Sequence, residues 1–518
     1  MDSKIMILWA DDEIELLKPH ILFLEEKGYG VSTANSGDVA IEMAKSEKFD
    51  IVFLDENMPG LSGLETLTKI KAIHPVTPVI MITKSEEEHL MDDAIGSKIA
   101  DYLIKPVNPN QILLALKKNL ENKRLVNQKN TIGYQQEFRS IGLSLTENLK
   151  QAEWIEIYKK LVSWELKLDE TNDPGMMDIF KMQKTEANLL FGKFIEANYI
   201  GWLNGKIQDP PLLSNTLFKK RIYPLLESGD KYMVIVVDNL RFDQWKVLEP
   251  LISETYRVVQ EEVYFSILPS ATQYARNALF AGLMPSQIEK QYPQWWLNDE
   301  DDGGKNRFEE ELLDAQLKRW NKPVKFSFNK VTNLGAGKKL SENLSNITNN
   351  QLNFLVYNFV DMLSHARTEM EIIRELADDE SAYRSITKSW FLHSPLQDII
   401  KQLASKKIKL IITTDHGTIK VTEPTKVVGD KNVNTNLRYK NGKSMDFNKK
   451  DVFLVKNPED AFLPRQHLSS SYLFAKNDLF FAYPNNYNHY VSYYRNTFQH
   501  GGISMEEMLI PFITLEPR

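Results

Sequence analysis

Short apolar runs that stop at an aspartate recur in the first and last parts of this chain. In the first part, Asp11 and Asp12 follow one such run and Asp55 ends another. These runs alternate with amphipathic helical patterns, as in a parallel α/β sheet, and parallel strands bring their carboxyl ends to one edge. We therefore expect a small domain whose acids meet at that edge. Its strands are predicted at 5–10, 30–34, 51–55, 78–83 and 100–104.

The rest of the chain divides into a helical part and a second α/β part. At 518 residues the chain exceeds what one hydrophobic core normally organises. Pro109 opens a long helical pattern, and two further amphipathic segments follow, separated by a turn signal at 172–175. Apolar runs that end in aspartate then return at 232–238, 354–361 and 409–415, and we expect these runs to be parallel strands. We expect an α/β domain over 1–120, a helical bundle linker over 121–204 and an α/β domain over 205–518.

Composition and charge exclude several classes of protein. The chain contains no cysteine, so disulfides and thiolate metal sites are excluded and any metal ion must be held by carboxylates and imidazoles. A net charge of −7 gives no general attraction to nucleic acid or to an anionic membrane. No apolar run approaches membrane-spanning length, and no helix-turn-helix pattern follows the first domain. We expect a cytoplasmic protein without membrane insertion and without a DNA-binding domain.

The first domain carries the groups that a phosphoryl-accepting carboxylate needs. Asp11, Asp12 and Asp55 can hold a divalent cation, and Asp55 is the acid at the end of the third strand. Lys105 comes after the fifth strand and Thr83 ends the fourth, so a fixed cation and a hydroxyl can bind the new phosphoryl oxygens. Acids at strand ends are also common helix N-caps, but the whole set at these positions favours phosphoryl chemistry.

This set resembles the response-regulator receiver family, whose motifs stand here as DD at 11–12, DENMPG at 55–60 and KP at 105–106. The resemblance implies a Mg²⁺ ion, a sensor histidine kinase as partner and a homodimer when phosphorylated. Lys84 departs from the family pattern, which usually has a small residue there, and so bears on access to the phosphoryl group. The implied roles fall on Asp55 as phosphoacceptor, on Thr83, Tyr102 and Lys105 as switch residues, and on Asp11, Asp12, Asp55 and Asn57 as Mg²⁺ ligands.

The last domain carries a metal-ligand pattern and a hydroxyl in separated segments. Two divalent ions that share six nitrogen and oxygen ligands have three each, which leaves open positions for phosphate oxygens. Two such ions about 4 Å apart can also activate a nucleophile. A threonine hydroxyl needs such activation, since its alkoxide is inaccessible at neutral pH. The candidate threonine stands just after a Pro-Ser-Ala turn, where we expect a helix to begin. The backbone N–H groups at a helix N-terminus favour binding of a phosphate. The candidates are Asp238, Asp361, Asp415, His365, His416 and His500, with Thr272 as the hydroxyl.

The segments TTDHG at 413–417 and HGGISMEEMLIP at 500–511 resemble the alkaline phosphatase superfamily, and within it the PglZ branch. The resemblance implies two Zn²⁺ ions and a phospho-threonine intermediate on Thr272. A receiver joined by helices to a PglZ domain resembles the PorX-like response regulators, which implies a role in the control of type IX secretion. One ion would take Asp361, His365 and His500, and the other Asp238, Asp415 and His416.

The sequence leaves the phosphate ester open. An aromatic-rich insertion at 287–296 has rings that can stack a base, and a lysine-rich insertion at 420–450 can hold an anionic chain, although such rings are more often core and such lysines solvated. Arg241 and Arg276 suit either a monoester dianion or a structural ion pair. We expect a phosphodiesterase on a nucleotide-type substrate. A phosphomonoesterase or phosphotransferase, or a non-catalytic effector that binds a partner, remain the alternatives.

Overall fold

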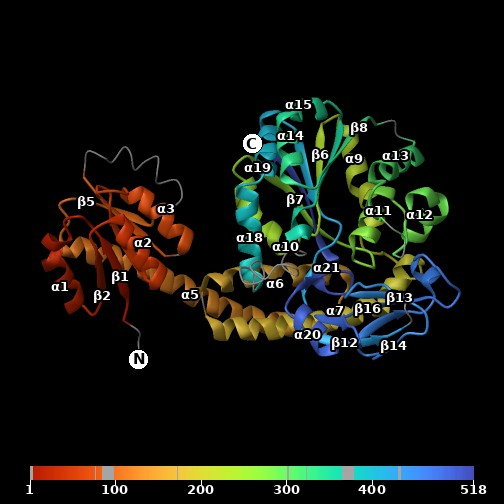
Figure 1. Ribbon diagram of the computed structural model, residues 1–518, viewed down its shortest axis with the longest axis horizontal. Helices are drawn as coiled ribbons and strands as arrows, with labels where there is room; N and C mark the ends of the chain where they lie inside the picture. Colours follow the sequence, from red (N-terminus) through yellow and green to blue (C-terminus); the bar gives the residue numbers. More distant parts are fainter. Residues whose placement is uncertain are drawn as a thin grey trace. The chain divides into compact units, whose positions relative to one another are not determined.

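The computed structural model of the chain describes residues 4–75, 77–84, 99–171, 173–299, 301, 303–321, 324–363, 379–429 and 433–518 (Figure 1). The chain forms two compact units. One consists of Met1–Glu137 with Glu170–Asp173, and the other of Phe138–Asp169 with Pro174–Arg518. Within the described ranges, no helix has the length and apolar composition needed to cross a membrane.

The first unit is a five-stranded parallel sheet with strand order β2-β1-β3-β4-β5. Every strand predicted in this part forms, and the predicted parallel fold is confirmed. The strands are β1 Met6–Ala10, β2 Gly30–Ala34, β3 Ile51–Asp55, β4 Val79–Thr83 and β5 Asp101–Ile104. The described helices are η1 Ile14–Leu17, α1 Lys18–Glu26, α2 Gly37–Ser46, α3 Gly63–Ile73 and α5 Pro109–Leu145, and the last turns of α5 belong to the second unit.

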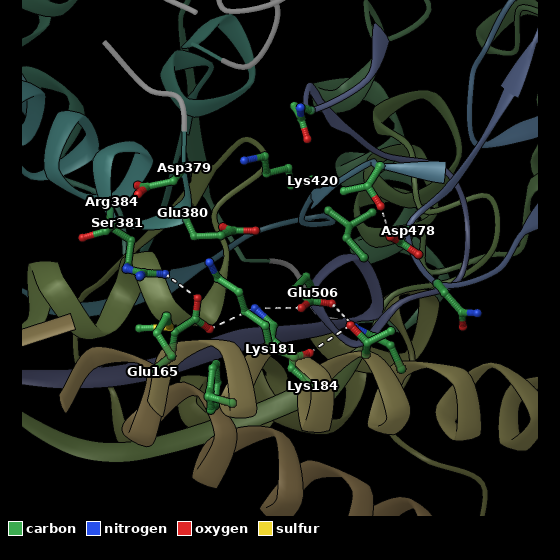
Figure 2. A pocket seen from close by; sticks show the side chains of 18 of the residues that line it. Glu165, Lys181, Lys184, Asp379, Glu380, Ser381, Arg384, Lys420, Asp478 and Glu506 are labelled. Atoms are coloured by element: carbon green, nitrogen blue, oxygen red, sulfur yellow. Dashed lines mark hydrogen bonds and ion pairs between the residues drawn. The ribbon is translucent and has the colours of Figure 1, made fainter. Parts of the chain in front are cut away.

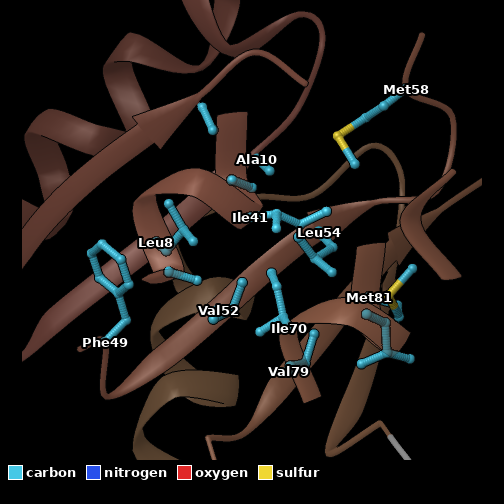
Figure 3. Close-up of a cluster of buried hydrophobic side chains, with 14 residues drawn as sticks. Leu8, Ala10, Ile41, Phe49, Val52, Leu54, Met58, Ile70, Val79 and Met81 are labelled. Atoms are coloured by element: carbon cyan, nitrogen blue, oxygen red, sulfur yellow. The ribbon is translucent and has the colours of Figure 1, made fainter. Parts of the chain in front are cut away.

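The core of the first unit lies on both faces of this sheet, because successive side chains of a strand point to opposite faces. On one face, Leu8 and Val52 pack with Ile70 of α3 (Figure 3). Trp9 and Phe53 belong to a second buried cluster. A sheet with two apolar faces needs helices on both sides, which explains why the central strands β1, β3 and β4 are almost entirely apolar.

The second unit contains a helical part and a six-stranded mixed sheet with strand order β7-β19-β10-β6-β9-β8. Neighbouring strands from β10 to β8 are parallel, whereas β19 runs antiparallel to both β10 and β7. The strands are β6 Tyr232–Val237, β7 Tyr256–Phe265, β8 Phe326–Val331, β9 Leu352–Tyr357, β10 Lys409–Thr413 and β19 Leu509–Pro517. The two long helices after α5 are α6 Gln151–Thr171 and α7 Pro174–Leu203.

Shorter helices accompany the second sheet. The described ones are α8 Ser214–Leu217, η3 Phe218–Ile222, α9 Tyr223–Leu225, η4 Leu226–Ser228, α10 Phe242–Ile252, α11 Thr272–Ala281, α12 Pro285–Gln291, η5 Pro293–Trp295, α13 Glu309–Arg319, α14 Leu334–Glu342, α15 Leu344–Ile347, α18 Glu380–Leu392, α19 Pro395–Ser405, η6 Pro458–Ala461, α20 Tyr487–Tyr494 and α21 Met505–Met508.

The lysine-rich insertion is folded rather than a plain loop, because it contributes strands to small sheets. Their orders are β11-β18, β14-β12-β17 and β13-β16-β15. The strands are β11 Ile419–Lys420, β12 Glu423–Val428, β13 Tyr439–Gly442, β14 Asp446–Phe447, β15 Val452–Val455, β16 Ser471–Ala475, β17 Leu479–Ala482 and β18 Phe498–Gln499.

Candidate functional site

The receiver residues lie at the carboxyl edge of the first sheet. Lys105 Nζ lies 2.8 Å from Asp55 Oδ1 and 3.1 Å from Asp11 Oδ2. Asp11, Asp12 and Asp55 each offer an oxygen within 4.8 Å of the others. Because Asp12 is exposed while the other two acids are buried, the cluster opens to solvent on one side. Three carboxylates with an open side suit a hard divalent cation such as Mg²⁺.

Asp55 is held close to the start of α3. A Cβ added to Gly63 would lie 2.4 Å from Asp55 O, so only glycine lets the helix begin this near the acid. Burial raises the pKa of the Asp55 carboxyl, and Lys105 beside it acts in the opposite direction. Thr83 is buried at the end of the neighbouring strand β4.

The remaining receiver predictions fall around this cluster. Asn57 is exposed in the loop after β3, and Tyr102 is half-buried on β5, packed against the cluster shown in Figure 3. Lys84 is exposed and directly follows Thr83, whose Oγ1 donates to Lys84 O at 3.3 Å. An exposed lysine therefore directly follows the predicted switch threonine.

Three neighbouring strands of the second sheet present the predicted acids. The strands β10, β6 and β9 are adjacent and parallel, so the residues that follow them meet at one edge. Asp238 directly follows β6, and Asp415 comes two residues after β10. The prediction that Asp361 ends a strand is wrong, because β9 stops at Tyr357 and the chain has entered a helical turn before Asp361.

His416 joins these acids to the candidate nucleophile. Its Nε2 lies 2.9 Å from Thr272 Oγ1, 3.7 Å from Asp415 Oδ2 and 3.9 Å from Asp238 Oδ1. The ligand atoms of Asp238, Asp415 and His416 lie within 4.8 Å of one another, and all three residues are buried. His416 Nδ1 lies 3.1 Å from Gly417 O, so a proton on Nδ1 leaves Nε2 as the atom available to a metal ion.

Thr272 is the first residue of α11, with Ala271 as its N-cap. The first backbone N–H groups of a helix have no partner within the helix and favour an anion. Asn306 Nδ2 donates to Thr272 O at 3.0 Å, which holds the start of the helix in place. The hydroxyl and the phosphate-binding end of a helix therefore occupy one position, beside His416.

The buried acid cluster fits a divalent metal ion. Asp238 Oδ1 is buried and has no hydrogen-bond partner among the residues that the structure describes. Burial, together with the carboxylates of Asp415 and Asp361, raises the pKa of Asp238 against the opposing charge of Arg276. A buried carboxylate oxygen without a hydrogen-bond partner is costly, and carboxylate oxygens with an imidazole nitrogen form a donor set that suits Zn²⁺.

The other predicted ligand group begins directly beside the first. The rings of His416 and His500 stack with their centroids 4.3 Å apart. His500 Nε2 lies 3.7 Å from Asp361 Oδ1, and Asn239 Nδ2 donates to the same oxygen at 3.4 Å. His365, the third predicted member of this group, lies outside the described residues.

Arg276 is a residue of this site whose role the sequence left undecided. Its guanidinium is fully buried, pairs with Asp238, and places Nε 3.0 Å from Asp415 Oδ2. Its Nη1 lies 3.4 Å from Glu309 Oε1. Arg276 therefore orients two predicted metal ligands instead of facing a substrate. Its spacing of four residues from Thr272 on α11 is the sequence signal that could have placed it here.

The loop that carries the last predicted histidine is held by groups that sequence reasoning missed. Gly501 N donates to Ser270 Oγ at 3.2 Å, and Ser270 Oγ donates to Gly502 O at 2.8 Å. Gly502 N and Arg438 Nε both donate to Glu507 Oε1, at 2.9 Å and 3.0 Å. The segment before Thr272 and a buried ion pair thus support the loop on two sides.

Each of the two insertions contributes a buried side chain of the kind considered for ligand binding. Trp296 is buried and meets Tyr274 edge-on, with ring centroids 5.7 Å apart. Lys440 is also buried, its Nζ donates to Asn434 O at 2.8 Å, and burial lowers its pKa to about 7. Trp296 is therefore a core residue, as the alternative for the rings predicted, whereas Lys440 is buried instead of solvated.

Comparison with known families accounts for all three parts of the chain. The receiver domain model of response regulators matches residues 7–117, and the PorX response regulator linker domain model matches 124–203. The model of the BREX system PglZ alkaline phosphatase-like domain matches 217–515, more than half of the chain. The chain belongs to the PorX-like response regulators. Receiver domains bind Mg²⁺ and imply a sensor kinase partner, and alkaline phosphatase-like domains are metalloenzymes.

Individual response regulators match about a quarter of this chain. The chain is 36% identical over 124 residues to the alginate biosynthesis transcriptional regulatory protein AlgB of Pseudomonas putida, covering 24% of this chain and 28% of that protein. It is 31% identical over 142 residues to the transcriptional regulatory protein ZraR of Escherichia coli K12, covering 27% of this chain and 32% of that protein. A CheY-like receiver structure from Methanospirillum hungatei is 28% identical, with a TM-score of 0.23, over 23% of this chain and 96% of that chain. The chain thus spans about a third or less of the length of these two curated regulators.

Proposed function

We propose that phosphorylation of Asp55 controls a two-metal phosphohydrolase in the PglZ domain, with the three parts bounded at 1–120, 121–204 and 205–518. The observation that supports this most directly is the distance of 2.9 Å between Thr272 Oγ1 and His416 Nε2, beside Asp238 and Asp415. A hydroxyl that starts a helix and touches a cation-binding cluster has the surroundings that phosphoryl transfer requires.

In the proposed reaction, Thr272 Oγ1 loses its proton and forms a bond to phosphorus while the bond to the leaving oxygen breaks and that oxygen gains a proton. The first N–H groups of α11 bind the other phosphate oxygens. Water then displaces threonine from phosphorus, which releases the product and restores the hydroxyl. Two bound Zn²⁺ ions would supply activation of the hydroxyl and neutralisation of phosphate charge. We assign one ion to Asp238, Asp415 and His416 and the other to Asp361, His365 and His500.

We favour a phosphodiester of the nucleotide type as substrate. A monoester carries a second negative charge that an arginine near the nucleophile commonly balances. Here Arg276 is paired with Asp238 and Asp415, and Arg241 with Asp243 and Glu380, so both candidate arginines are committed to carboxylates. The match to the PorX linker supports a place for this output in the control of type IX secretion.

Zinc-loaded protein is expected to hydrolyse bis-p-nitrophenyl phosphate faster than p-nitrophenyl phosphate. Chelation should abolish both activities and added Zn²⁺ should restore them, because the hydroxyl depends on the ion for activation. Metal content and both rates are measured on the same sample. Faster cleavage of the monoester would favour the monoesterase or phosphotransferase alternative. Bound zinc without turnover of either ester would favour the partner-binding effector.

Phosphorylation is expected to convert the protein to a homodimer. The half-buried Tyr102 on β5 and the buried Thr83 on β4 are the candidate sensors of charge at Asp55. Light scattering with and without a phosphate mimic measures the mass, and Asp55→Ala serves as the control that cannot respond. An unchanged mass at micromolar concentrations would remove this mechanism.

A further inference from the structure

A chain of buried charges runs from the linker helices α6 and α7 to the predicted metal site. We call this set the ionic ring, and part of it is visible in Figure 2. All its members lie in the second unit. The ring consists of Glu506, Lys184, Glu165, Arg384, Asp243 and Arg241.

Lys184 on α7 links two acids of the ionic ring that lie on different helices. Its Nζ lies 2.9 Å from Glu165 Oε2 on α6 and 3.0 Å from Glu506 Oε1 on α21 (Figure 2). Asn188, one turn later on α7, donates to Glu506 Oε2 at 2.9 Å and accepts from Met505 N at 2.8 Å. The helix α7 therefore holds both the side chain of Glu506 and the backbone beside it.

Arg384 on α18 links Glu165 of α6 to Asp243 of α10, the helix that follows Asp238 in the chain. Its Nη1 lies 3.0 Å from Glu165 Oε1 and 2.8 Å from Asp243 Oδ2. Arg241 Nε donates to the other Asp243 oxygen, Oδ1, at 2.8 Å. Within the ring, each inner member thus contacts two members of opposite charge, and each of the two end members contacts one.

The two ends of the ring meet at Gly417, the residue after His416. A Cβ added to Gly417 would lie 2.1 Å from Glu506 O and 3.3 Å from Arg241 Cγ. Gly417 N also donates to Glu507 O at 3.1 Å. The turn that carries His416 is therefore enclosed between the first and last members of the ring, with no room for a side chain.

Burial makes this geometry rigid. The side chains of Glu165, Glu506 and Arg384 are 6%, 3% and 3% exposed, and that of Lys184 is 15% exposed where a cavity of about 410 Å³ adjoins the ring. Burial alone would raise the pKa of Glu165, but Lys184 and Arg384 hold it below its usual value. Breaking one buried pair leaves an uncompensated charge, so the members have few alternative positions.

We propose that α6 and α7 position His416 through the ionic ring, and that Lys184 and Glu165 are positioning residues of the metal site. The proposal rests on the proposed two-metal function. Groups that hold a metal ligand in its orientation govern metal affinity even when they do not touch the ion. A displacement of α6 relative to α7 would reach His416 through Glu506 and Gly417.

The test replaces Lys184 in the full-length protein. Lys184→Met is expected to accelerate hydrogen exchange in the peptide 413–420 of the metal-free protein, because Glu506 loses the charge that holds it beside Gly417. In the zinc-loaded protein it should weaken binding of one ion, measured by chelator competition, by about 10- to 100-fold. Turnover of bis-p-nitrophenyl phosphate should fall through kcat while KM stays unchanged.

The control is Lys181→Met, which removes an exposed lysine from the preceding turn of α7 in the same cavity lining. It should match the parent in every measurement. Lys184→Arg should restore zinc affinity, and Asn188→Ala, a milder change, should give a smaller effect of the same kind. Parent-like exchange at 413–420 in a folded Lys184→Met protein overturns the inference, as does parent-like zinc affinity. If the parent binds no zinc and Lys184→Met still exchanges faster at 413–420, the two-metal function is contradicted. The role of the ionic ring in holding the turn at Gly417 is then still supported.

Discussion

Thr272→Val is expected to reduce phosphate-ester hydrolysis by about 10³-fold or more while the protein keeps its fold and its metal content. Valine has nearly the shape of threonine but has no hydroxyl, so the group that attacks phosphorus is removed and its neighbours are not. Thr272 is not among the proposed ligands of either ion. The measurements are the rate on bis-p-nitrophenyl phosphate, zinc content and circular dichroism.

Two further variants test the roles of the hydroxyl and of the metal ligands separately. Thr272→Ser retains the hydroxyl and should keep most of the activity. His500→Ala should lose zinc and activity together, because one ion would retain only two protein ligands. Cleavage by Thr272→Val at the parent rate would place the nucleophile elsewhere and would contradict the proposed mechanism at its centre.

Asp55→Ala is expected to abolish phosphoryl labelling completely. Asp55 is the acid whose Oδ1 lies 2.8 Å from Lys105 Nζ, within the cluster that Asp11 and Asp12 complete. A carboxylate attacks phosphorus only where a cation neutralises the incoming phosphate, and this cluster can hold such a cation beside a fixed ammonium group. Incubation with acetyl phosphate and Mg²⁺, followed by intact mass measurement, should show one added phosphoryl group in the parent and none in the variant.

The matched control is Glu47→Ala, which removes an exposed acid just after α2 and should label like the parent. Lys105→Met should label more slowly, since Asp55 remains but loses its ion pair. Undiminished labelling of Asp55→Ala would show that another group accepts the phosphoryl.

The sequence alone determined the strands of the first unit, and it predicted several of the side chains that the structure brings together at the edges of the two sheets. All five strand predictions hold. The central strands β1, β3 and β4 were the clearest, because a sheet with both faces covered requires continuous apolar runs and such runs are visible in one dimension. Asp238 and Asp415 were placed at strand ends for the same reason. Asp361 was misplaced because the boundary between β9 and the following helix lies within apolar sequence, FLVYNFVD, whose periodicity does not mark the change.

Only the tertiary structure decided how the candidate site is supported. The role of Arg276 depended on which carboxylates surround it, and Asp238 and Asp415 arrive from two different strands. Lys184 and Glu506 are separated by 322 positions in the chain but by 3.0 Å between their charged atoms. Local patterns specify which face of an element is apolar, whereas the partner of a buried charge is specified only when folding brings distant elements together and removes water from between them.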